Sequence, residues 1–478
     1  MRRPFPTVRT GILVMVSLIA AVNPGWLRAE STPVLADVVL SGEAVNQVTS
    51  TLDRSVKRSR LVALNVAALP SPAVQSQFIR QPALSFDLFP DAYVVAVFDR
   101  FDANASGITW VGHVENMPGS SVTLVYSGGL MTGSFNMRTG VFQIRPAAED
   151  VRSANRQSSG EVHVVSEVDQ AALPREAEPI VPTISQELQT AAALRPMADS
   201  GGTIDVMMLY TSLAQSAAGG ATGIVNLINL AVSETNTTYA NSDIKQRVRL
   251  VNAALVPYVE GSGFSANLSN LRAGAGGLSG VLALRNQFQA DLVMLLVHPP
   301  SPDFCGIAYV MASVTTAFEP NGYSVTDTSC VPTLTVPHEW GHNMGALHDW
   351  YVSPGVQPYS YAHGYANWRA GQRWRTVMSY NDICAVQGFN CTRLLAWANP
   401  DQGLNPFCNG SNFVCRPQLW YVPGEGGTGI KSGTRSNCLA GVIPSPDCDA
   451  DDHRALNNTA ITVANFRQSA TSTASSKR

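Results

Sequence analysis

Charge and long apolar runs are scarce in this 478-residue sequence, and cysteine is missing from most of its length. Charged residues make up only 14%, and 32 Lys and Arg against 35 Asp and Glu give a net charge of -3. This balance excludes a polyanion-binding surface, so we expect no nucleic-acid partner. Beyond the N-terminal region no segment approaches transmembrane length, and we expect no membrane contact once that region is removed.

The N-terminal region carries the only pronounced apolar run. Three arginines near the start precede Ile12–Val22, and Leu27-Arg28-Ala29 offers a small-residue cleavage site. The pattern is typical of a secretory signal peptide over residues 1–29, and the run is too short for an uncleaved anchor. We therefore expect a secreted protein that passes through the periplasm in transit. Nothing in the sequence suggests an obligate dimer, so we expect a monomer.

All eight cysteines fall between Cys305 and Cys448. An even number of cysteines in an exported chain predicts disulfides, although many pairings are open. Proximity along the chain favours three of them, Cys384–Cys391, Cys408–Cys415 and Cys438–Cys448, which leaves Cys305–Cys330 as the fourth pair.

A short histidine-rich segment carries the clearest chemical signal. His338 and His342 stand four residues apart, so a helix would present both imidazoles to one metal ion, with Glu339 on the same rim. His348 follows, and Gly345 can supply the positive φ at which a helix stops and the chain turns back. Three neutral imidazoles with one open position predict a catalytic zinc site.

The complete pattern, H-E-x-x-H-x-x-G-x-x-H-D, runs from His338 to Asp349 and has the form of the metzincin zinc signature. Further along the chain, Thr376–Tyr380 supplies the Met-turn that accompanies this signature. Two separate parts of one site occur in the right order. This order disfavours the alternative that the histidines only decorate an exposed polar helix.

The residue types predict hydrolysis of a peptide bond without a covalent intermediate. Zinc would polarise a bound water and the scissile carbonyl, while Glu339 takes the water's proton and delivers it to the leaving amine. We expect Met378 to pack beneath the ligands and Asp349 to orient the end of the motif through hydrogen bonds. The Met-x-Tyr spacing resembles that of astacins and serralysins, which implies that Tyr380 is a displaceable fifth ligand that then hydrogen-bonds the transition state. A tyrosine merely packed under the site is the open alternative.

Residues 30–197 form a cysteine-free unit for which we predict a β-rich fold. Short runs separated by Gly, Asn and Pro turns predict six strands: Tyr93–Phe98, Ile108–Val114, Ser121–Tyr126, Leu130–Asn136, Val141–Arg145 and Glu161–Val168. From Ala171 to Met197 the chain loses periodicity and collects prolines, as exposed linkers do. We interpret the unit as a propeptide that keeps the rest of the chain latent. A permanent accessory domain is the alternative. No thiol is available to cap the zinc, so latency must come from another ligand or from occlusion.

Residues 198–467 show a different pattern, in which strands and helices alternate. The segments are Ile204–Tyr210, Ala221–Asn241, Arg247–Val256, Leu278–Gln289 and Asp291–Val297. This βαβαβ order predicts an α/β (α+β) domain with a mixed, mostly parallel sheet, and a zinc-binding helix from about Leu334 to Met344. Because the zinc signature lies in the same unit, we expect it to be a metzincin catalytic domain. Gly306–Met311 is expected to form an edge strand to which an extended polypeptide substrate adds. An edge covered by a loop is the alternative.

The chain is less regular after the third histidine. Four acids near the last cysteine, Asp447, Asp449, Asp451 and Asp452, could bind a structural calcium ion, but they lack the spacing of an EF-hand and a solvated acidic loop is favoured. His363 is expected to be a packed or surface histidine rather than a further ligand. Ala455–Phe466 predicts a closing helix, and residues 468–478 a disordered tail.

Several segments between Thr203 and Phe466 resemble bacterial peptidyl-Asp metalloendopeptidases, which are secreted metzincins related to the reprolysins. Besides the zinc motif, they are Val206–Thr211, Ala231–Asn236, Cys305–Tyr309, Arg375–Asn381 and Asn457–Ala460. The resemblance implies a zinc metalloendopeptidase with His338, His342 and His348 as zinc ligands and Glu339 as the base. Residues Cys408–Cys448 depart from the family as enlarged loops, which puts the substrate specificity in doubt.

Cleavage before aspartate would require a cation in the pocket that follows the scissile bond, because a buried carboxylate needs a partner. Arg373, Arg375 and Arg393 flank the expected region, although for each of them taken singly a surface or structural role is favoured. One alternative is a reprolysin-like protease that prefers hydrophobic residues on this side of the bond. Another is a non-catalytic adhesin or matrix-binding module, against which Glu339 argues because such a protein has no need of a general base.

Overall fold

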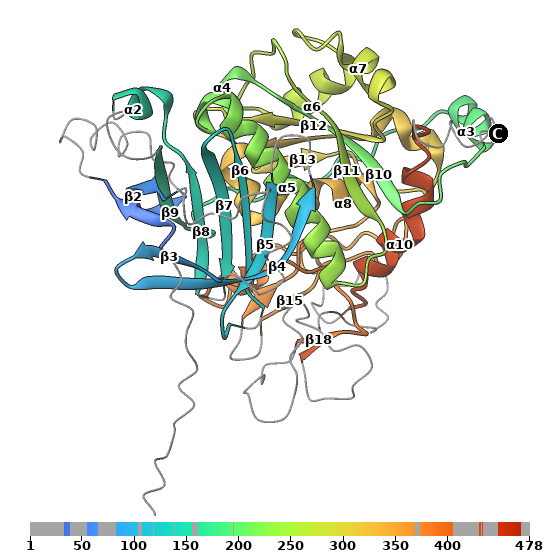
Figure 1. Ribbon diagram of the computed structural model, residues 1–478. Coiled ribbons are helices and arrows are strands. Elements are labelled where there is room, and N and C mark those ends of the chain that lie inside the picture. Colours follow the sequence, from blue (N-terminus) through green and yellow to red (C-terminus); the bar gives the residue numbers. More distant parts are fainter. Residues whose placement is uncertain are drawn as a thin grey trace, which may run out of the picture.

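The computed structural model describes residues 33–38, 55–65, 83–103, 108–117, 119–137, 139–154, 161–194, 196–368, 373–404, 430–431, 433 and 448–469. The predicted signal peptide, the Cys408–Cys415 pair, Cys438 and most of the predicted tail lie outside these residues. Two β-sheets dominate the described part of the chain, and helix α5 (Ala221–Asn241) packs between them (Figure 1). No helix among the described residues is both long and apolar enough to cross a bilayer.

The N-terminal unit is a nine-stranded antiparallel sheet with the order β1-β2-β9-β8-β7-β6-β5-β4-β3. Its strands are β1 (Leu35–Asp37), β2 (Val56–Leu64), β3 (Ala83–Phe89), β4 (Ala92–Ala103), β5 (Ile108–Val114), β6 (Ser121–Ser127), β7 (Leu130–Met137), β8 (Gly140–Pro146) and β9 (Val162–Val168). The predicted β-rich fold is confirmed with all six predicted strands, whereas β1, β2 and β3 were not predicted. The N–H of Val34 donates to Ser85 O at 3.0 Å, so the sheet curls until its two ends nearly meet.

Aromatic side chains contribute to a hydrophobic core formed by this sheet. Phe86 on β3 and Phe135 on β7 are fully buried and meet edge to face, with ring centroids 4.9 Å apart. Trp110 on β5 belongs to the same core. The unit therefore has an apolar core of its own and needs no disulfide to hold it.

The second unit contains a five-stranded sheet with the order β11-β10-β12-β14-β13. The strands are β10 (Thr203–Tyr210), β11 (Arg247–Leu255), β12 (Leu292–Val297), β13 (Gly306–Ala308) and β14 (Tyr323–Asp327), and only β13 runs antiparallel to its neighbour. The predicted mixed, mostly parallel sheet is confirmed, and β13 is its edge as predicted. β10 and β12 are almost continuously apolar and are buried along nearly their whole length, as expected for central strands of a parallel sheet.

Helices and short strands complete the chain. The helices are α2 (Glu149–Ala154), α3 (Gln186–Ala193), α4 (Ser212–Ala217), α6 (Phe264–Ala273), α7 (Val281–Phe288), α8 (Thr335–Asn343), α9 (Asp382–Ala385) and α10 (Asp452–Val463), with 3-10 turns η3 (Thr316–Asn321) and η4 (Thr328–Thr333). The short strands are β15 (Ala366–Asn367), β16 (Trp374–Arg375), β17 (Thr392–Arg393), β18 (Gly403–Leu404) and β19 (Ile430–Lys431).

Helix α5 is buried on two sides, against β11 of its own unit and against β6 and β7 of the N-terminal unit. Polar contacts join the two units along this helix. The amide of Asn226 donates to Leu130 O at 3.0 Å, and the amide of Asn136 donates to Glu234 Oε1 at 3.1 Å. The face of α5 that meets the N-terminal sheet therefore carries polar residues. In an amphipathic surface helix the corresponding face would be exposed to solvent.

We expect Glu234→Gln to stabilise the full chain at pH 7.5 by roughly 2–4 kcal/mol. Burial raises the pKa of Glu234 to about 8. The folded chain therefore keeps a proton that the unfolded chain loses above its ordinary pKa of 4.5, and the parent loses stability as the pH rises between these values. Glutamine resembles the protonated acid and carries no such cost.

Urea unfolding of parent and variant at pH 5 and pH 7.5 measures this effect. At pH 5 the two proteins should differ by less than about 1 kcal/mol, since both are uncharged at this position. An equal difference at both pH values would show that Glu234 is ionised in the folded chain.

Candidate active site

Helix α8 places three of the predicted residues. It starts after Leu334, which has φ of 68°, and Pro337 is tolerated in the first turn because the N–H that it lacks would have no partner inside the helix. The helix ends at the expected glycine. Gly345 has φ of 91°, and the N–H of Ala346 donates back to Gly341 O at 2.8 Å. The turn sends the chain back toward α8 and brings His348 to the same point as His338 and His342.

The three imidazoles are fully buried and converge through their Nε2 atoms. Nε2 of His348 lies 3.1 Å from Nε2 of His338 and 3.0 Å from Nε2 of His342. Nδ1 of His338 donates to Val377 O, and Nδ1 of His342 donates to Ala346 O, both at 2.9 Å. A neutral imidazole has one N–H, so these two Nε2 atoms carry lone pairs. Burial also lowers the pKa of His338 to about 3, which keeps the ring in the neutral form that binds metals.

Lone pairs that face one another at this distance repel unless a cation lies between them. Tetrahedral zinc with bonds of about 2.1 Å places its ligands about 3.4 Å apart, close to the separations observed here. Within the described ranges this is the only His, Cys, Asp and Glu cluster with such spacing. The three histidines therefore fit a catalytic zinc ion, and the chemistry of a three-imidazole donor set agrees with zinc rather than calcium or magnesium.

Glu339 lies beside the cluster with its carboxylate fully buried, and neither oxygen has a hydrogen-bond partner in the described part of the chain. Burial, and next the charge of Glu176, raise the pKa of Glu339 well above its usual range. Strand β13 passes so close to Glu339 that position 306 has no room for a side chain. A Cβ at Gly306 of β13 would come within 2.4 Å of Glu339 Oε1, so the glycine is required for the strand to pass this close.

The Met-turn lies directly under the histidines and is held by Asp349. Met378 is fully buried. Asp349 accepts hydrogen bonds from the N–H of Tyr380 at 2.8 Å and from the hydroxyl of Ser379 at 3.1 Å. This carboxylate thus ties the end of the zinc motif to the turn, which is the orienting contact expected from the sequence.

Tyr380 packs against the zinc-binding cluster, with its ring tilted over that of His348 and the two centroids 4.1 Å apart. Its hydroxyl donates to the backbone carbonyl of Glu176 at 2.5 Å, and burial raises its pKa above the ordinary value. The hydroxyl is therefore positioned at the site but engaged by the N-terminal segment. A role for Tyr380 as a fifth ligand stays a prediction.

Residues Arg175–Ile180, which join the two units, lie along the edge strand β13. The N–H of Ala177 donates to Gly306 O at 2.8 Å, that of Ile180 to Ala308 O at 2.9 Å, and that of Val310 to Ile180 O at 2.9 Å. The segment runs parallel to the strand. The expectation of an exposed linker is therefore wrong here, because Glu176 and Ala177 are buried against the site.

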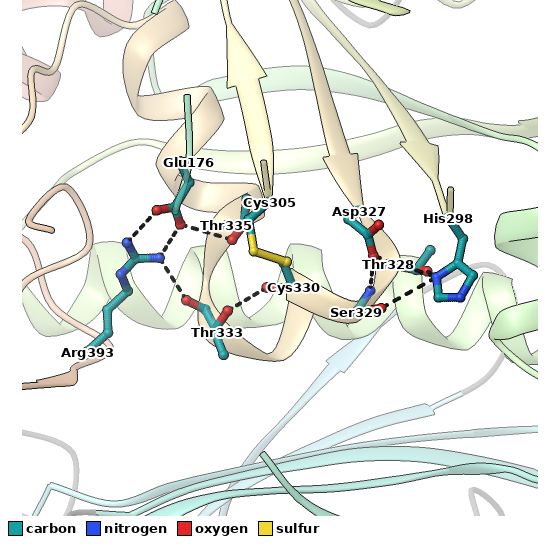
Figure 2. The surroundings of a disulfide bond; sticks show 10 residues. All are labelled: Glu176, His298, Cys305, Asp327, Thr328, Ser329, Cys330, Thr333, Thr335 and Arg393. Carbon is teal, nitrogen blue, oxygen red and sulfur yellow. Dashed lines mark hydrogen bonds and ion pairs between the residues drawn. A yellow bond between two sulfur atoms is a disulfide. The ribbon is translucent and has the colours of Figure 1, made fainter. Parts of the chain in front are cut away.

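The three arginines near the site differ in what they contact. Arg373 is exposed and stacks on Phe389. Arg375 is buried but donates to backbone carbonyls, those of Ser379 at 2.6 Å and Cys391 at 3.1 Å. Only Arg393 meets a carboxylate, that of Glu176, with Nη2 at 2.9 Å from Oε2 and Nη1 in contact with Oε1 (Figure 2).

Two of the predicted disulfides are present, Cys305–Cys330 and Cys384–Cys391. The first joins the start of β13 to η4, which leads into α8, and so ties the edge strand to the zinc-binding helix (Figure 2). Cys448 is also disulfide-bonded, while Cys408, Cys415 and Cys438 lie outside the described residues.

Two other sequence expectations concern residues outside the site. His363 is buried against the ring of Trp350 and contacts backbone carbonyls, so it is packed and takes no part in the zinc-binding cluster. The expected solvated acidic loop is wrong for Asp451 and Asp452, which are buried where α10 begins and packs on Ala398. Asp451 lies 2.5 Å from His453 Nδ1, and Asp447 lies outside the described residues. The acids that are described form no cluster with metal-ligand spacing.

The sequence did not indicate Glu176 or Thr335 as residues of this site. Thr335 stands just before the zinc motif, where a threonine is ordinary at the start of a helix. Glu176 belongs to a proline-rich connection without periodicity, so no local pattern could single it out.

Comparisons with known proteins agree with the site. Residues 202–405 match the family described as Metallo-peptidase family M12B Reprolysin-like. A protein of Stenotrophomonas maltophilia named peptidyl-Asp metalloendopeptidase is 28% identical over 87% of this chain and 92% of its own length. A protein of the same name from Xanthomonas campestris is 30% identical over 60% of this chain and 64% of its own length.

Among solved structures, metalloproteinase-II from Bacteroides fragilis aligns with 58% of this chain and 84% of its own, at 11% identity and a TM-score of 0.36. That resemblance is too weak to guide the assignment of residues. The family match coincides with the unit that holds the buried histidines and Glu339. The chain is therefore a zinc metalloendopeptidase that acts on polypeptides, and its residues 202–405 are similar to the reprolysin-like metallopeptidases of family M12B.

Proposed function

We propose that this protein is a secreted zinc endopeptidase, made as a zymogen, that hydrolyses peptide bonds with Glu339 as general base and cleaves on the N-terminal side of aspartate. The observation that carries the chemistry is the carboxylate of Glu339, buried and without a hydrogen-bond partner in the described residues, beside three convergent imidazoles. The preference for aspartate is supported by the names of the relatives. Export is supported by the signal-peptide pattern of residues 1–29.

Zinc, when bound, would activate water and polarise the scissile carbonyl. Glu339, whose carboxylate is buried beside the three imidazoles, is placed to take a proton from the attacking water and to pass it to the leaving amine. Asp349 and the Met-turn hold the ligand side chains in place. Once Glu176 has left, the hydroxyl of Tyr380 is free to donate to the oxygen that develops charge.

Latency follows from the occupied edge strand. Main-chain groups of β13 that would bind an extended substrate are already paired with residues 175–180. Substrate and segment therefore compete for the same hydrogen bonds, and this competition is a form of occlusion that needs no thiol. It supports the interpretation of residues 30–197 as a propeptide.

The test uses the full chain, purified and folded, before and after a limited proteolytic cut within residues 181–202. Released fragments of an unfolded protein are identified by mass spectrometry, with a chelator-treated control. We expect little cleavage before the cut, and after it chelator-sensitive fragments that mostly begin with Asp. Fragments with apolar N-termini would refute the aspartate preference, and full activity of the uncut chain would refute the zymogen.

A further inference from the structure

Glu176 occupies a pocket that is built for a carboxylate. Arg393 contacts both of its oxygens, and the hydroxyl of Thr335 donates to Oε1 at 3.0 Å (Figure 2). Arg393 and Glu176 are both almost fully buried. A buried anion held by a bidentate guanidinium and a hydroxyl is recognised by charge and by shape together.

The pocket adjoins the catalytic residues. Thr335 stands on α8 one turn before Glu339, so both side chains face the same side of the helix. The backbone carbonyl of Glu176 receives the hydroxyl of Tyr380. When the side chain of a residue fills this pocket, the peptide group of the same residue therefore lies at the reacting centre.

The pocket does not depend on Glu176 for its shape. Arg393 lies on β17, which pairs with β16, and its guanidinium also donates to Thr333 O at 3.0 Å. Its Nε has no partner among the described residues. When the N-terminal segment leaves, a buried guanidinium remains at the site without its counter-ion, an arrangement that favours any ligand able to supply a carboxylate.

The segment that carries Glu176 is itself bound as an extended peptide along β13. A substrate that adds to the same edge would also bring its side chains to this wall of the site. The other two arginines near the site offer no alternative, since Arg373 is exposed and Arg375 is engaged with backbone carbonyls.

We propose that Arg393 and Thr335 form the specificity pocket that receives the acidic side chain following the scissile bond, and that Glu176 of the N-terminal segment fills this pocket in the latent chain. The guanidinium of Arg393 then both selects the substrate and binds the segment that keeps the chain latent. This inference rests on the proposed peptidase function and adds the residues that select the substrate.

Binding tests the pocket without requiring turnover. The chain carrying Glu339→Gln is folded in full length, loaded with zinc, cut within residues 181–202, and titrated with two peptides that differ only in Asp or Asn after the bond to be cleaved. We expect the Asp peptide to bind roughly 100-fold more tightly, because Asn leaves the buried guanidinium unpaired. Adding Arg393→Gln should reduce this ratio to within about 5-fold of unity, and adding Thr335→Val should lower it about 10-fold.

The matched control is Asp243→Asn, an exposed acid in the turn after α5, where Asn tolerates the positive φ. It should leave the ratio unchanged. A ratio that survives Arg393→Gln would overturn the pocket. If the Asp preference in binding is lost with Arg393→Gln while the parent cleaves neither peptide, the pocket stands and the proposed peptidase function fails, so the two outcomes are distinguishable.

A second experiment uses the uncut, latent chain. Glu176→Gln in the uncut full chain should raise cleavage of the Asp peptide about 10-fold, because the segment loses its charged anchor. Glu187→Gln, an exposed acid on α3 in the same connection, is the control and should match the parent. Unchanged activity of Glu176→Gln would show that Glu176 does not hold the segment in the site.

Discussion

Glu339→Gln is expected to lower kcat/KM by about 10³-fold while the protein keeps its zinc. The carboxylate accepts no hydrogen bond from the described residues, so its replacement by an isosteric amide removes the base without breaking a hydrogen bond. The zinc site should persist because the three histidines supply the ligands. Zinc content, measured on the same preparation as the peptide cleavage rate, separates loss of the base from loss of the metal.

Asp243→Asn serves as the matched control for this experiment, because it also converts an acid to its amide but lies in an exposed turn. It should retain the parent rate. A Glu339→Gln variant that cleaves as fast as the parent would rule out Glu339 as the base. A variant that has lost its zinc would instead indicate that Glu339 helps to hold the metal.

Removal of the metal should abolish activity and also destabilise the protein. Without a cation, the nitrogens of His338, His342 and His348 face one another at 3.0–3.1 Å in a site closed to water. A metal that binds only the folded chain stabilises it by about 4 kcal/mol when present at 1,000 times its dissociation constant. Urea unfolding of chelated and zinc-reconstituted full chain therefore should differ by about this amount, in a measurement independent of turnover.

Reconstitution with zinc should restore both stability and activity, whereas magnesium should restore neither because it prefers oxygen ligands. Identical unfolding curves with and without the chelator, after confirmed loss of metal, would show that the histidine cluster does not bind the ion in the folded state. The Glu339→Gln variant should show the same stabilisation by zinc as the parent.

Much of the fold was predictable because its signals are local. Six strands of the N-terminal sheet are short runs between turn residues, and β10 and β12 of the second unit are nearly continuous apolar runs. Strands β2 and β3 lacked this clarity. β2 carries lysine and arginines along much of its length, and only its pairing with β9 makes it part of a sheet.

Two expectations failed for reasons that involve distant parts of the chain. The connection after Ala171 has the composition of a loop, yet Arg175–Ile180 gains main-chain hydrogen bonds from β13 and becomes buried. The acids near Cys448 have the composition of a solvated loop, yet Asp451 and Asp452 are buried where α10 packs. The composition of a segment indicates its structure in isolation. It carries no information about the surface against which the segment packs in the folded chain.

The sequence by itself determined the zinc-binding face. His338, Glu339 and His342 are placed by the pitch of one helix, and Gly345 returns the chain so that His348 joins them, all within a dozen residues. Only the tertiary structure decided which residues lie opposite this zinc-binding face. Glu176 and Arg393 are 217 residues apart and meet because two separate units pack around α5 and a segment between them follows the edge of a sheet. The spacing of residues along the chain determines geometry within one helix or turn. The pairing of distant charges instead depends on how the folded units pack against each other.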